Sequence, residues 1–425
     1  MTTVRLIILI VGVAIVAQVA DWQPLDRMAI GLIALLLFAF IWSKWSIRNL
    51  GITRTADTDR AQVGQTIRER VSVRNGGFLA KLWLEAKDYS SFPGHSASRV
   101  VHVRGHNVAE WVVETIAARR GRYHFGPMRI KSGDPFGLFP AKLSVPATID
   151  VLIYPAAVDV SGFPLPIGIL SGGNTTERKT PFTTASVAGI REYFPGDAYN
   201  RISWAATART GQLMVKEFDH DPSSDVWIVL DLDRNFSIRA LRPLGIAAGR
   251  DGEWPVEAWL DATEEYAVTV AASLTHRCLN QGLSVGLIST GAHYEVIPAD
   301  RSDRQYVKIL ETLAVVDADG HRPLAEVLVA EARRFTRQST LIVITSSTDE
   351  AWVRMLAEIT GKRVRSAAIF VEPETFGHAK TSQMILSSLL AAGISTHLIK
   401  YGDDIGRALS TNGVSHVPTG RAIVG

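Results

Sequence analysis

The sequence is short of cysteine and of charge. Its 425 residues include one cysteine, Cys278, which excludes a disulfide framework and any zinc site that needs two thiolates. Charged residues make up 20% of the chain, and 45 basic against 42 acidic residues leave a net charge of +3. So close a balance gives no reason to expect a nucleic-acid partner. The length suggests two or three domains, and 47% hydrophobic residues suffice to fold them.

Motifs that would indicate an enzyme are missing as well. The chain contains no Walker-type phosphate loop and no HExxH zinc motif. Cys278 falls within an amphipathic stretch, where a packing role is more common than a nucleophilic one. We therefore expect no catalytic residue. The residues of a Ser–His–Asp triad need not be close in sequence, so a hydrolase remains the least favoured hypothesis.

Two apolar runs stand near the N-terminus, at residues 4–20 and 28–42. Each is near the lower length limit for a membrane-spanning helix, and interfacial tryptophans extend them, namely Trp22, Trp42 and Trp45. Pro24 lies in the short connector and disfavours a single continuous helix. The pattern predicts a transmembrane helical hairpin over residues 1–49. A cleaved signal peptide followed by one anchor is the alternative.

Positive charge follows the second apolar run. The basic residues of this flank are Lys44, Arg48, Arg54 and Arg60, whereas Arg27 in the connector is balanced by two aspartates. Lys and Arg near the ends of spans remain in the cytosol. We therefore expect both termini, and all the soluble parts, on the cytosolic side.

Residues 50–158 carry the pattern of a β-sandwich. Short alternating runs at 65–74, 81–85 and 109–116 are separated by turn-forming residues. Two turn-rich motifs follow at 120–127 and 134–139, and we expect a structural role for both. The nearby basic residues are predicted to form a solvated face: Arg119, Arg120, Arg122 and Lys131.

Hydrophobic residues follow a different pattern in residues 225–425. Continuous apolar runs of strand length, such as 226–230 and 340–345, alternate with helical stretches such as 262–280 and 352–360. This alternation predicts a doubly wound α/β sheet. Ligands of such sheets bind beyond the carboxyl ends of the strands, which is where Asp231 falls.

Residues 159–224 form a linker and a segment rich in charged and aromatic side chains. A turn is expected at 195–197, and a short helical turn at 205–209 is expected to end at Gly211. Arginine and carboxylate side chains can pair bidentately, so the segment is interpreted as a structural clasp or, alternatively, as a docking face for a partner protein.

This segment resembles the signature of the domain of unknown function 58 family, which consists of bacterial membrane proteins. The matching residues are Arg191, Glu192, Tyr193, Pro195, Gly196, Asp197, Arg201, Ile202, Trp204, Ala208, Arg209, Leu213, Lys216 and Glu217. The motifs at 120–127 and 134–139 and the apolar N-terminus match too, so the resemblance covers nearly the whole chain. It implies a von Willebrand factor A-like domain and a MoxR-type AAA+ ATPase as partner. A non-enzymatic protein of the bacterial cytoplasmic membrane follows from the same resemblance.

A von Willebrand-type domain would hold Mg²⁺ with oxygen ligands after its first strand, so the resemblance directs attention to Asp231, Asp233 and Asn235. The hydroxyl residues of the motif are missing here. Residues 320–324, where a ligating threonine would fall, contain none, and residues 345–347 lack the expected aspartate. We therefore expect a degenerate site held by hydrogen bonds, and a Mg²⁺-dependent ligand-binding module is the alternative function.

The loop at residues 236–259 contains two tryptophans, Trp254 and Trp259, at the predicted carboxyl edge of the sheet. Aromatic side chains at such a rim are typical anchors of protein interfaces. The favoured hypothesis is thus a membrane-anchored scaffold that docks an ATPase at this edge, in assembly or remodelling of protein complexes or the cell envelope. The sequence leaves the oligomeric state open.

Overall fold

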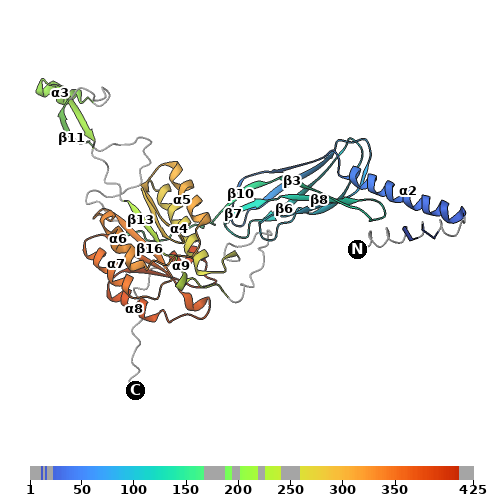
Figure 1. Ribbon diagram of the computed structural model, residues 1–425. Helices are drawn as coiled ribbons and strands as arrows, with labels where there is room; N and C mark the ends of the chain where they lie inside the picture. Colours follow the sequence, from blue (N-terminus) through green and yellow to red (C-terminus); the bar gives the residue numbers. More distant parts are fainter. Residues whose placement is uncertain are drawn as a thin grey trace, which may run out of the picture. The chain divides into compact units, whose positions relative to one another are not determined.

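The computed structural model describes residues 11–12, 15–16, 23–166, 187–193, 202–218, 225–240 and 259–410. The chain divides into an N-terminal unit, Met1–Pro155, and a C-terminal unit, Ala156–Gly425 (Figure 1). The sequence predicts a finer division, at residues 49, 158 and 224, which stays a prediction.

The N-terminal unit begins with an apolar helix, α2 (Gln23–Ser46). Its 24 residues extend about 36 Å at 1.5 Å per residue, enough to cross a hydrocarbon core of about 30 Å. Within the described part of the chain it is the one helix that is long and apolar enough to span a membrane. The second predicted run, 28–42, lies within it.

The predicted hairpin is not confirmed. Most of the first run, 4–20, lies outside the described residues, and the expected connector is helical from Gln23 onward. Pro24 is accommodated because it stands in the first turn, where its missing N–H would have had no helical partner.

The rest of this unit, the β domain, consists of three sheets. Their strand orders are β1-β3-β6, β2-β10-β7 and β5-β4-β8-β9. The strands are β1 (Leu50–Ala56), β2 (Arg60–Gln62), β3 (Thr66–Asn75), β4 (Lys81–Asp88), β5 (Arg99–Val103), β6 (Val108–Ile116), β7 (Gly121–Phe125), β8 (Met128–Gly133), β9 (Pro140–Val145) and β10 (Ile149–Tyr154). All their pairings are antiparallel except that of β10 with β2.

Alternating hydrophobicity produces the core of the β domain. In β3 almost every second residue is buried, so one face of the strand points inward. One cluster joins Val71 and Trp111 of the first sheet to Leu84 and Ile130 of the third, and a second cluster surrounds Phe125 and Ile153. The β-rich character of the predicted sandwich domain is therefore confirmed.

A cluster of charged side chains is buried in the same domain. Arg54 pairs with Glu69, and its Nη2 atom also lies 2.8 Å from Oδ1 of Asp88. The Nε2 atom of His95 lies 2.9 Å from Oε2 of Glu69, and its Nδ1 atom lies 2.7 Å from the hydroxyl of Thr115. All four ionisable side chains are almost completely buried, so the charges of Arg54, Glu69 and Asp88 compensate one another rather than being solvated by water.

The motif at residues 120–127 supports this cluster. The Phe125 ring stacks on His95 with centroids 4.4 Å apart. Gly126 has a φ of 93°, and a Cβ atom there would lie 2.2 Å from the carbonyl oxygen of Ala147. Arg120 is buried rather than solvated, which corrects the prediction for this member of the basic cluster.

The C-terminal unit contains a six-stranded sheet with the order β15-β14-β13-β16-β17-β18 (Figure 1). Five strands are parallel and β15 is antiparallel. The strands are β13 (Val226–Leu230), β14 (Val285–Thr290), β15 (Tyr294–Asp300), β16 (Thr340–Thr345), β17 (Arg365–Val371) and β18 (Ser395–Ile399). The helices that accompany them are α4 (Thr263–Asn280), α5 (Asp303–Val315), α6 (Leu324–Glu331), α7 (Ala351–Gly361), α8 (Gln383–Ala391) and α9 (Ile405–Ser410).

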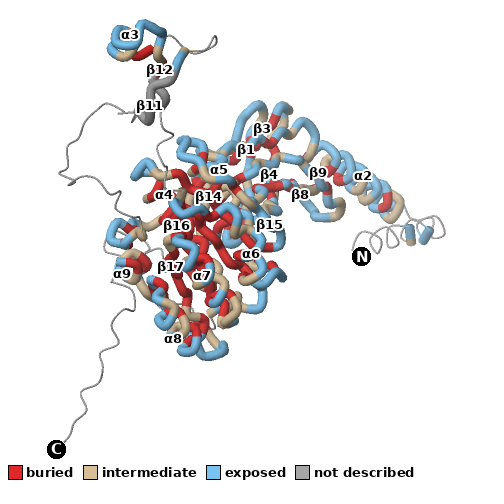
Figure 2. The backbone as a smooth tube through the Cα atoms, turned by 90° about the vertical axis from the view of Figure 1, so that its left-hand side faces the viewer, coloured by how far each residue is buried: buried red, intermediate tan, exposed pale blue. Residues whose placement is uncertain are grey.

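Every residue of β13 and β16 is buried, so both faces of the sheet's centre are covered (Figure 2). One hydrophobic core joins Trp227 and Val343 in the strands to Val327, Trp352 and Ile385 in α6, α7 and α8. Helix α4 contacts β13, β14, β16 and β17. The sheet is thus fixed at its centre, and the loops after β13 and β16 start from rigid positions.

The buried charge cluster generates a prediction. Arg54→Met would leave Glu69 and Asp88 buried without their cation, so the free energy of opening β1 and β3 should fall by about 3–5 kcal/mol. Hydrogen exchange of the full-length protein in detergent measures this.

The matched control is Arg68→Met in β3. Arg68 pairs with Glu114 at 2.9 Å, but both side chains are exposed, so the change should stay within about 1 kcal/mol. Equal effects of the two substitutions would show that the buried cluster is not a stabilising network.

Candidate functional site

The site is centred on Asp231, the first residue after β13. This carboxylate is 4% exposed, and each of its oxygens accepts hydrogen bonds. The hydroxyl of Thr345, at the end of β16, donates to Oδ2 over 2.6 Å. The Thr290 hydroxyl and the Asp233 amide donate to Oδ1 over 3.3 and 3.2 Å. Asp231 therefore connects the carboxyl ends of β13, β14 and β16.

Burial raises the pKa of Asp231 to about 6. The hydrogen bonds from Thr345 and Asp233 act in the opposite direction, because they favour the ionised form, and the nearby Asp233 carboxylate raises the pKa further. A carboxyl group with this pKa is ionised at neutral pH and gains a proton as the pH falls below about 6.

Two other segments complete this edge of the sheet. The Arg234 amide donates to the Gly320 carbonyl over 3.0 Å, and the Gly320 amide donates to the Leu232 carbonyl over 3.1 Å. A Cβ atom at Gly320 would lie 1.9 Å from the Thr290 carbonyl oxygen, so glycine is required there. The hydroxyl of Ser346 donates to the Phe236 carbonyl over 2.8 Å. Residues 320–324 and 345–347 thus lie beside the Asp231 loop.

The residues at this edge do not fit a Mg²⁺ site of the von Willebrand type. Both oxygens of Asp231 are engaged by hydrogen bonds, whereas Mg²⁺ demands open oxygen ligands in octahedral geometry. The Asp233 carboxylate accepts from the amide and side chain of Asn235, both over 2.9 Å. The cavity beside Asp231 measures about 10 Å³, which is too small for a hydrated ion. In the described part of the chain no group of three or more His, Cys, Asp or Glu residues is arranged to hold a metal.

An open cavity of about 580 Å³ adjoins this loop. Its polar lining comes from the segments after β13 and β16, from α7 and from the segment before α8, and includes Asp233, Asn235, Asp349, Glu350, Arg354 and Lys380. Both signs of charge are thus present at one opening. The sequence analysis missed Arg354 and Lys380, because they lie on or near helices and carry no motif of their own.

The signature segment forms a small lobe of its own. Strands β11 (Val187–Glu192) and β12 (Met214–Phe218) pair antiparallel, with Arg191 opposite Val215 and Ile190 opposite Lys216. The short helix α3 (Trp204–Thr210) ends at Gly211, whose φ of 75° confirms the predicted helix stop. The Tyr193 amide donates to the Leu213 carbonyl over 2.9 Å.

The clasp hypothesis stays a prediction, because most of the side chains that it names lie outside the described residues. Trp204 is 68% exposed, and Arg209 is exposed as well. An indole so exposed does not stabilise the lobe by burial. Pro195, Gly196, Asp197 and Arg201 lie outside the described residues, as do the side chains of Arg191, Lys216 and Glu217.

The predicted docking loop is described only at its two ends. Trp254 lies outside the described residues, and Trp259 is half-buried. Two contacts join the chain on either side of the undescribed part. The amide of Ala240 donates to the Asp261 carbonyl over 2.6 Å, and the Arg239 side chain pairs with the Asp261 carboxylate at 2.5 Å. The loop therefore begins and ends at neighbouring positions.

An apolar helix followed by a β-rich domain and an α/β unit defines the general class of this protein. The profile of the family described as "Protein of unknown function DUF58" matches residues 189–242 and 261–375. The uncharacterized protein YeaD of Bacillus subtilis is 25% identical over 340 residues, which cover 77% of this chain and 78% of the relative. The profile match and this relative together support a DUF58 family protein.

Other similarities are more limited. The uncharacterized protein Mb1516 of Mycobacterium bovis is 26% identical over 189 residues, which cover 43% of this chain and 54% of the relative. Among solved structures, the von Willebrand A domain of SpRpn10 is 14% identical and covers 48% of this chain and 99% of that domain, with a TM-score of 0.29. The CARDB domain of PF1109 from Pyrococcus furiosus is 14% identical and covers 24% of this chain and 91% of that domain, with a TM-score of 0.18. Such scores are low, so the fold rests on this chain's own elements.

The raised pKa of Asp231 generates the second prediction. The folded protein holds a proton on Asp231 up to a pH of about 6, whereas the unfolded chain releases it near 3.8. The folded state therefore binds more protons between these values, and this group's contribution to stability falls as the pH rises through that window. Its size is up to about 3 kcal/mol, since one pKa unit corresponds to about 1.4 kcal/mol.

Asp231→Asn should remove this part of the pH dependence, because the amide does not titrate. The free energy of unfolding at β13 and β16 can be followed by hydrogen exchange in urea between pH 4 and 7. Asp349→Asn, an exposed carboxylate of the same edge, is the matched control and should keep the wild-type slope. A wild-type slope in Asp231→Asn as well would mean that Asp231 is ionised throughout.

Proposed function

We propose that this DUF58 protein is a membrane-anchored, non-enzymatic interaction protein that docks a MoxR-type AAA+ ATPase at the carboxyl edge of its α/β sheet. The ATPase would act on protein complexes or on the cell envelope, with this protein as its scaffold. The soluble parts face the cytosol of a bacterial cell, and residues 4–20 form a second membrane span beside α2. The α/β unit is a von Willebrand factor A-like domain with a doubly wound sheet.

The observation that carries the proposal is the position of the cavity of about 580 Å³. Its lining follows β13 and β16, which are neighbours at the centre of the sheet. The chain proceeds from β13 to β14 on one side and from β16 to β17 on the other, so the strand order reverses between them. Open α/β sheets bind their ligands at such a reversal, beyond the carboxyl ends of the strands.

The charges at the cavity favour a protein partner. Asp349 and Glu350 stand beside Arg354 and Lys380, so the opening is not uniformly positive or negative. A single acidic ligand would gain little from such a mixture, whereas a protein surface can match both signs and gain specificity. The hydrogen bonds of Asp231 keep the underlying loop rigid, as a docking surface requires.

Membrane anchoring rests on α2. Its apolar window has a mean hydropathy of 2.0 and only 11% of that window is buried by the protein. Exposed aliphatic and aromatic side chains cover its length, including Ile30, Leu37 and Phe38. The hydrocarbon core of a bilayer would remove these apolar side chains from water. In aqueous solution the same side chains would stay exposed to water.

Affinity capture from native membranes in Mg-ATP tests the docking proposal. Arg354→Glu reverses one charge at the cavity, and the recovery of an AAA+ ATPase should fall about tenfold, as a loss of about 1.4 kcal/mol implies. Lys362→Glu is the matched control, because Lys362 follows the same helix, is exposed and does not line the cavity.

Full recovery with Lys362→Glu and loss with Arg354→Glu would support docking at this edge. Equal recovery with both variants would keep the partnership and reject the surface. The absence of any AAA+ ATPase from the wild-type sample would reject the partnership itself.

A further inference from the structure

The end of α2 is fastened to the β domain. The hydroxyl of Ser43 donates to the Phe139 carbonyl over 2.6 Å, and the Phe40 and Phe139 rings meet edge to face at 5.6 Å. The Trp45 ring packs in the same way on Phe78 at 5.5 Å. These contacts fix the β domain at one end of α2, so a bilayer around α2 would meet this end of the domain.

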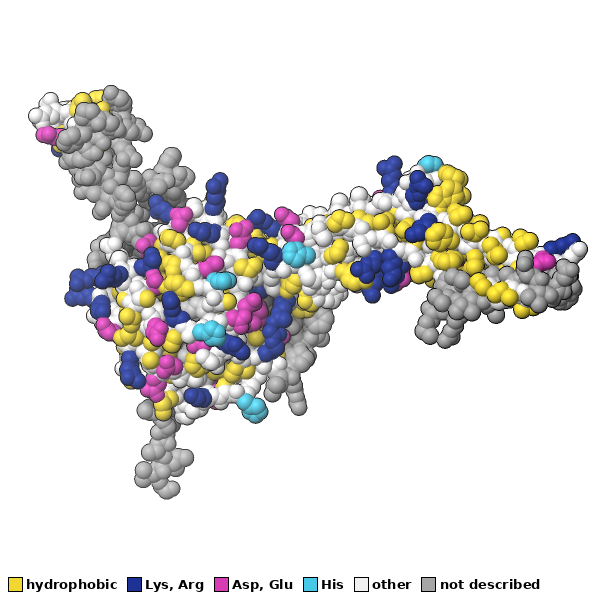
Figure 3. Space-filling view, in the orientation of Figure 1, with side chains coloured by type: hydrophobic (Ala, Val, Ile, Leu, Met, Phe, Trp, Pro, Cys, Tyr) yellow, Lys and Arg dark blue, Asp and Glu magenta, His cyan; other side chains and the backbone are white. Residues whose placement is uncertain are grey.

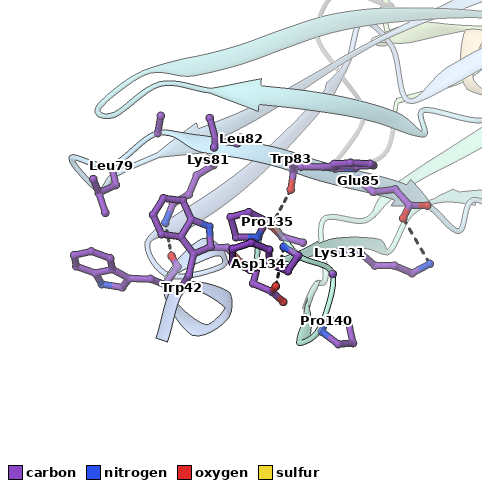
Figure 4. A pocket seen from close by; sticks show the side chains of 17 residues that line it. Trp42, Leu79, Lys81, Leu82, Trp83, Glu85, Lys131, Asp134, Pro135 and Pro140 are labelled. Carbon is purple, nitrogen blue, oxygen red and sulfur yellow. Dashed lines mark hydrogen bonds and ion pairs between the residues drawn. The ribbon is translucent and has the colours of Figure 1, made fainter. Parts of the chain in front are cut away.

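A cavity of about 710 Å³ opens at this junction (Figure 4). Its walls come from the last turns of α2, from the start of β4 and from the loop after β8, and include Trp42, Trp45, Leu82, Trp83, Pro135 and Phe136. The Trp83 side chain is 70% exposed, and Leu82 and Phe136 are exposed as well. Hydrophobic side chains also gather along α2 in the space-filling view (Figure 3). The apolar surface of α2 thus continues into the cavity.

The motif at residues 134–139 builds one wall of the cavity. Its buried carboxylate, Asp134, accepts hydrogen bonds from the amides of Phe136 and Phe139 over 2.9 and 2.6 Å. Just before this loop, the Ser132 hydroxyl at the end of β8 donates to the Trp83 carbonyl of β4 over 2.8 Å. The loop is therefore preorganised, and it holds Phe136 in an exposed position beside Trp83.

A buried cation lies in the same wall. Lys81 is 7% exposed, and its ammonium donates to the Trp45 carbonyl. In the described part of the chain no carboxylate lies within ion-pair distance of Lys81, whereas Lys131 nearby pairs with Glu85 at 3.8 Å. Burial lowers the pKa of Lys81. An ammonium has three donors, so it can still receive an anion at the cavity.

We propose that this cavity binds one acyl chain of an anionic phospholipid, with the lipid phosphate beside Lys81. The proposal rests on the membrane anchoring proposed above. Trp42 and Trp45 mark the end of α2, and tryptophans favour the level of the lipid headgroups, so the cavity would open where acyl chains meet headgroups. Its volume falls within the range of about 300–1,000 Å³ that is usual for small-molecule sites. Apolar walls match the acyl chain, and the buried ammonium matches the phosphate.

Photolabelling tests the proposal on the full-length protein in nanodiscs. The probe is phosphatidylglycerol with a diazirine on one acyl chain, and mass spectrometry locates the labelled residues. Label is expected in residues 79–85 and 131–137 as well as in α2. Ala80→Trp, which fills the cavity, should reduce label at both cavity segments about fivefold, whereas Val112→Trp on β6 should not.

The charge is tested separately. Lys81→Met should lower the label at the cavity segments about fivefold, as loss of one cation near a lipid phosphate implies, and Lys142→Met on β9 should leave it unchanged. If Ala80→Trp changes nothing, or if label stays confined to α2, the proposal is wrong.

Two further outcomes would assign the cavity to protein. With a photoreactive amino acid at Leu82 in place of the lipid probe, cross-links to residues 4–20 would show that the first apolar run fills the cavity. Cross-links between copies would show a self-association surface, and either outcome overturns lipid binding. Alkaline extraction of membranes reports anchoring independently. If alkaline extraction releases the wild-type protein from membranes and α2 carries no lipid label, the proposed membrane anchoring is wrong. In that case lipid binding in the cavity fails with it.

Discussion

The hydrogen bond from Thr345 to Asp231 is the contact on which the candidate docking edge depends. It joins the carboxyl ends of two neighbouring parallel strands, and Thr290 extends the connection to a third. A buried carboxylate without such donors would be costly, so these hydroxyls determine which conformation the loop after β13 can adopt. Two threonine hydroxyls thus supply hydrogen bonds that this buried carboxylate needs.

The same principle operates in the β domain. Arg54, Glu69, Asp88 and His95 interact where their side chains are buried from solvent, and Gly126 of the motif at 120–127 leaves room for Arg54. Such clusters contribute little compared with hydrophobic packing, but loss of one member is costly. Each unit therefore contains one buried polar arrangement that fixes its local geometry.

Hydrophobic periodicity predicted much of the fold. The five residues of β13 and the six of β16 coincide with the predicted apolar runs, because buried strands leave an uninterrupted signal. The antiparallel strand β15 was missed, since it lies at the edge of the sheet, is largely exposed and contains Pro298. Helix α5 was missed as well, although its buried residues recur at helical spacing.

The sites were less predictable than the strands. Asp231 was identified from its position after a strand, but its partners are Thr290 and Thr345, which are 59 and 114 residues away in the sequence. The cluster around Arg54 was invisible for the same reason. Arg120 shows the opposite error, because this cation was expected to be solvated and is buried. Burial depends on tertiary neighbours, and a single sequence does not specify them.

The most direct test of the central claim is site-specific photo-crosslinking in living cells. A photoreactive amino acid at Thr348, which lines the cavity of about 580 Å³, is compared with the same amino acid at Lys362, which does not. The account predicts a cross-link to an AAA+ ATPase from position 348 and none from position 362. Cross-links from position 362 alone, or from neither position while the ATPase is present, would contradict docking at the carboxyl edge of the sheet.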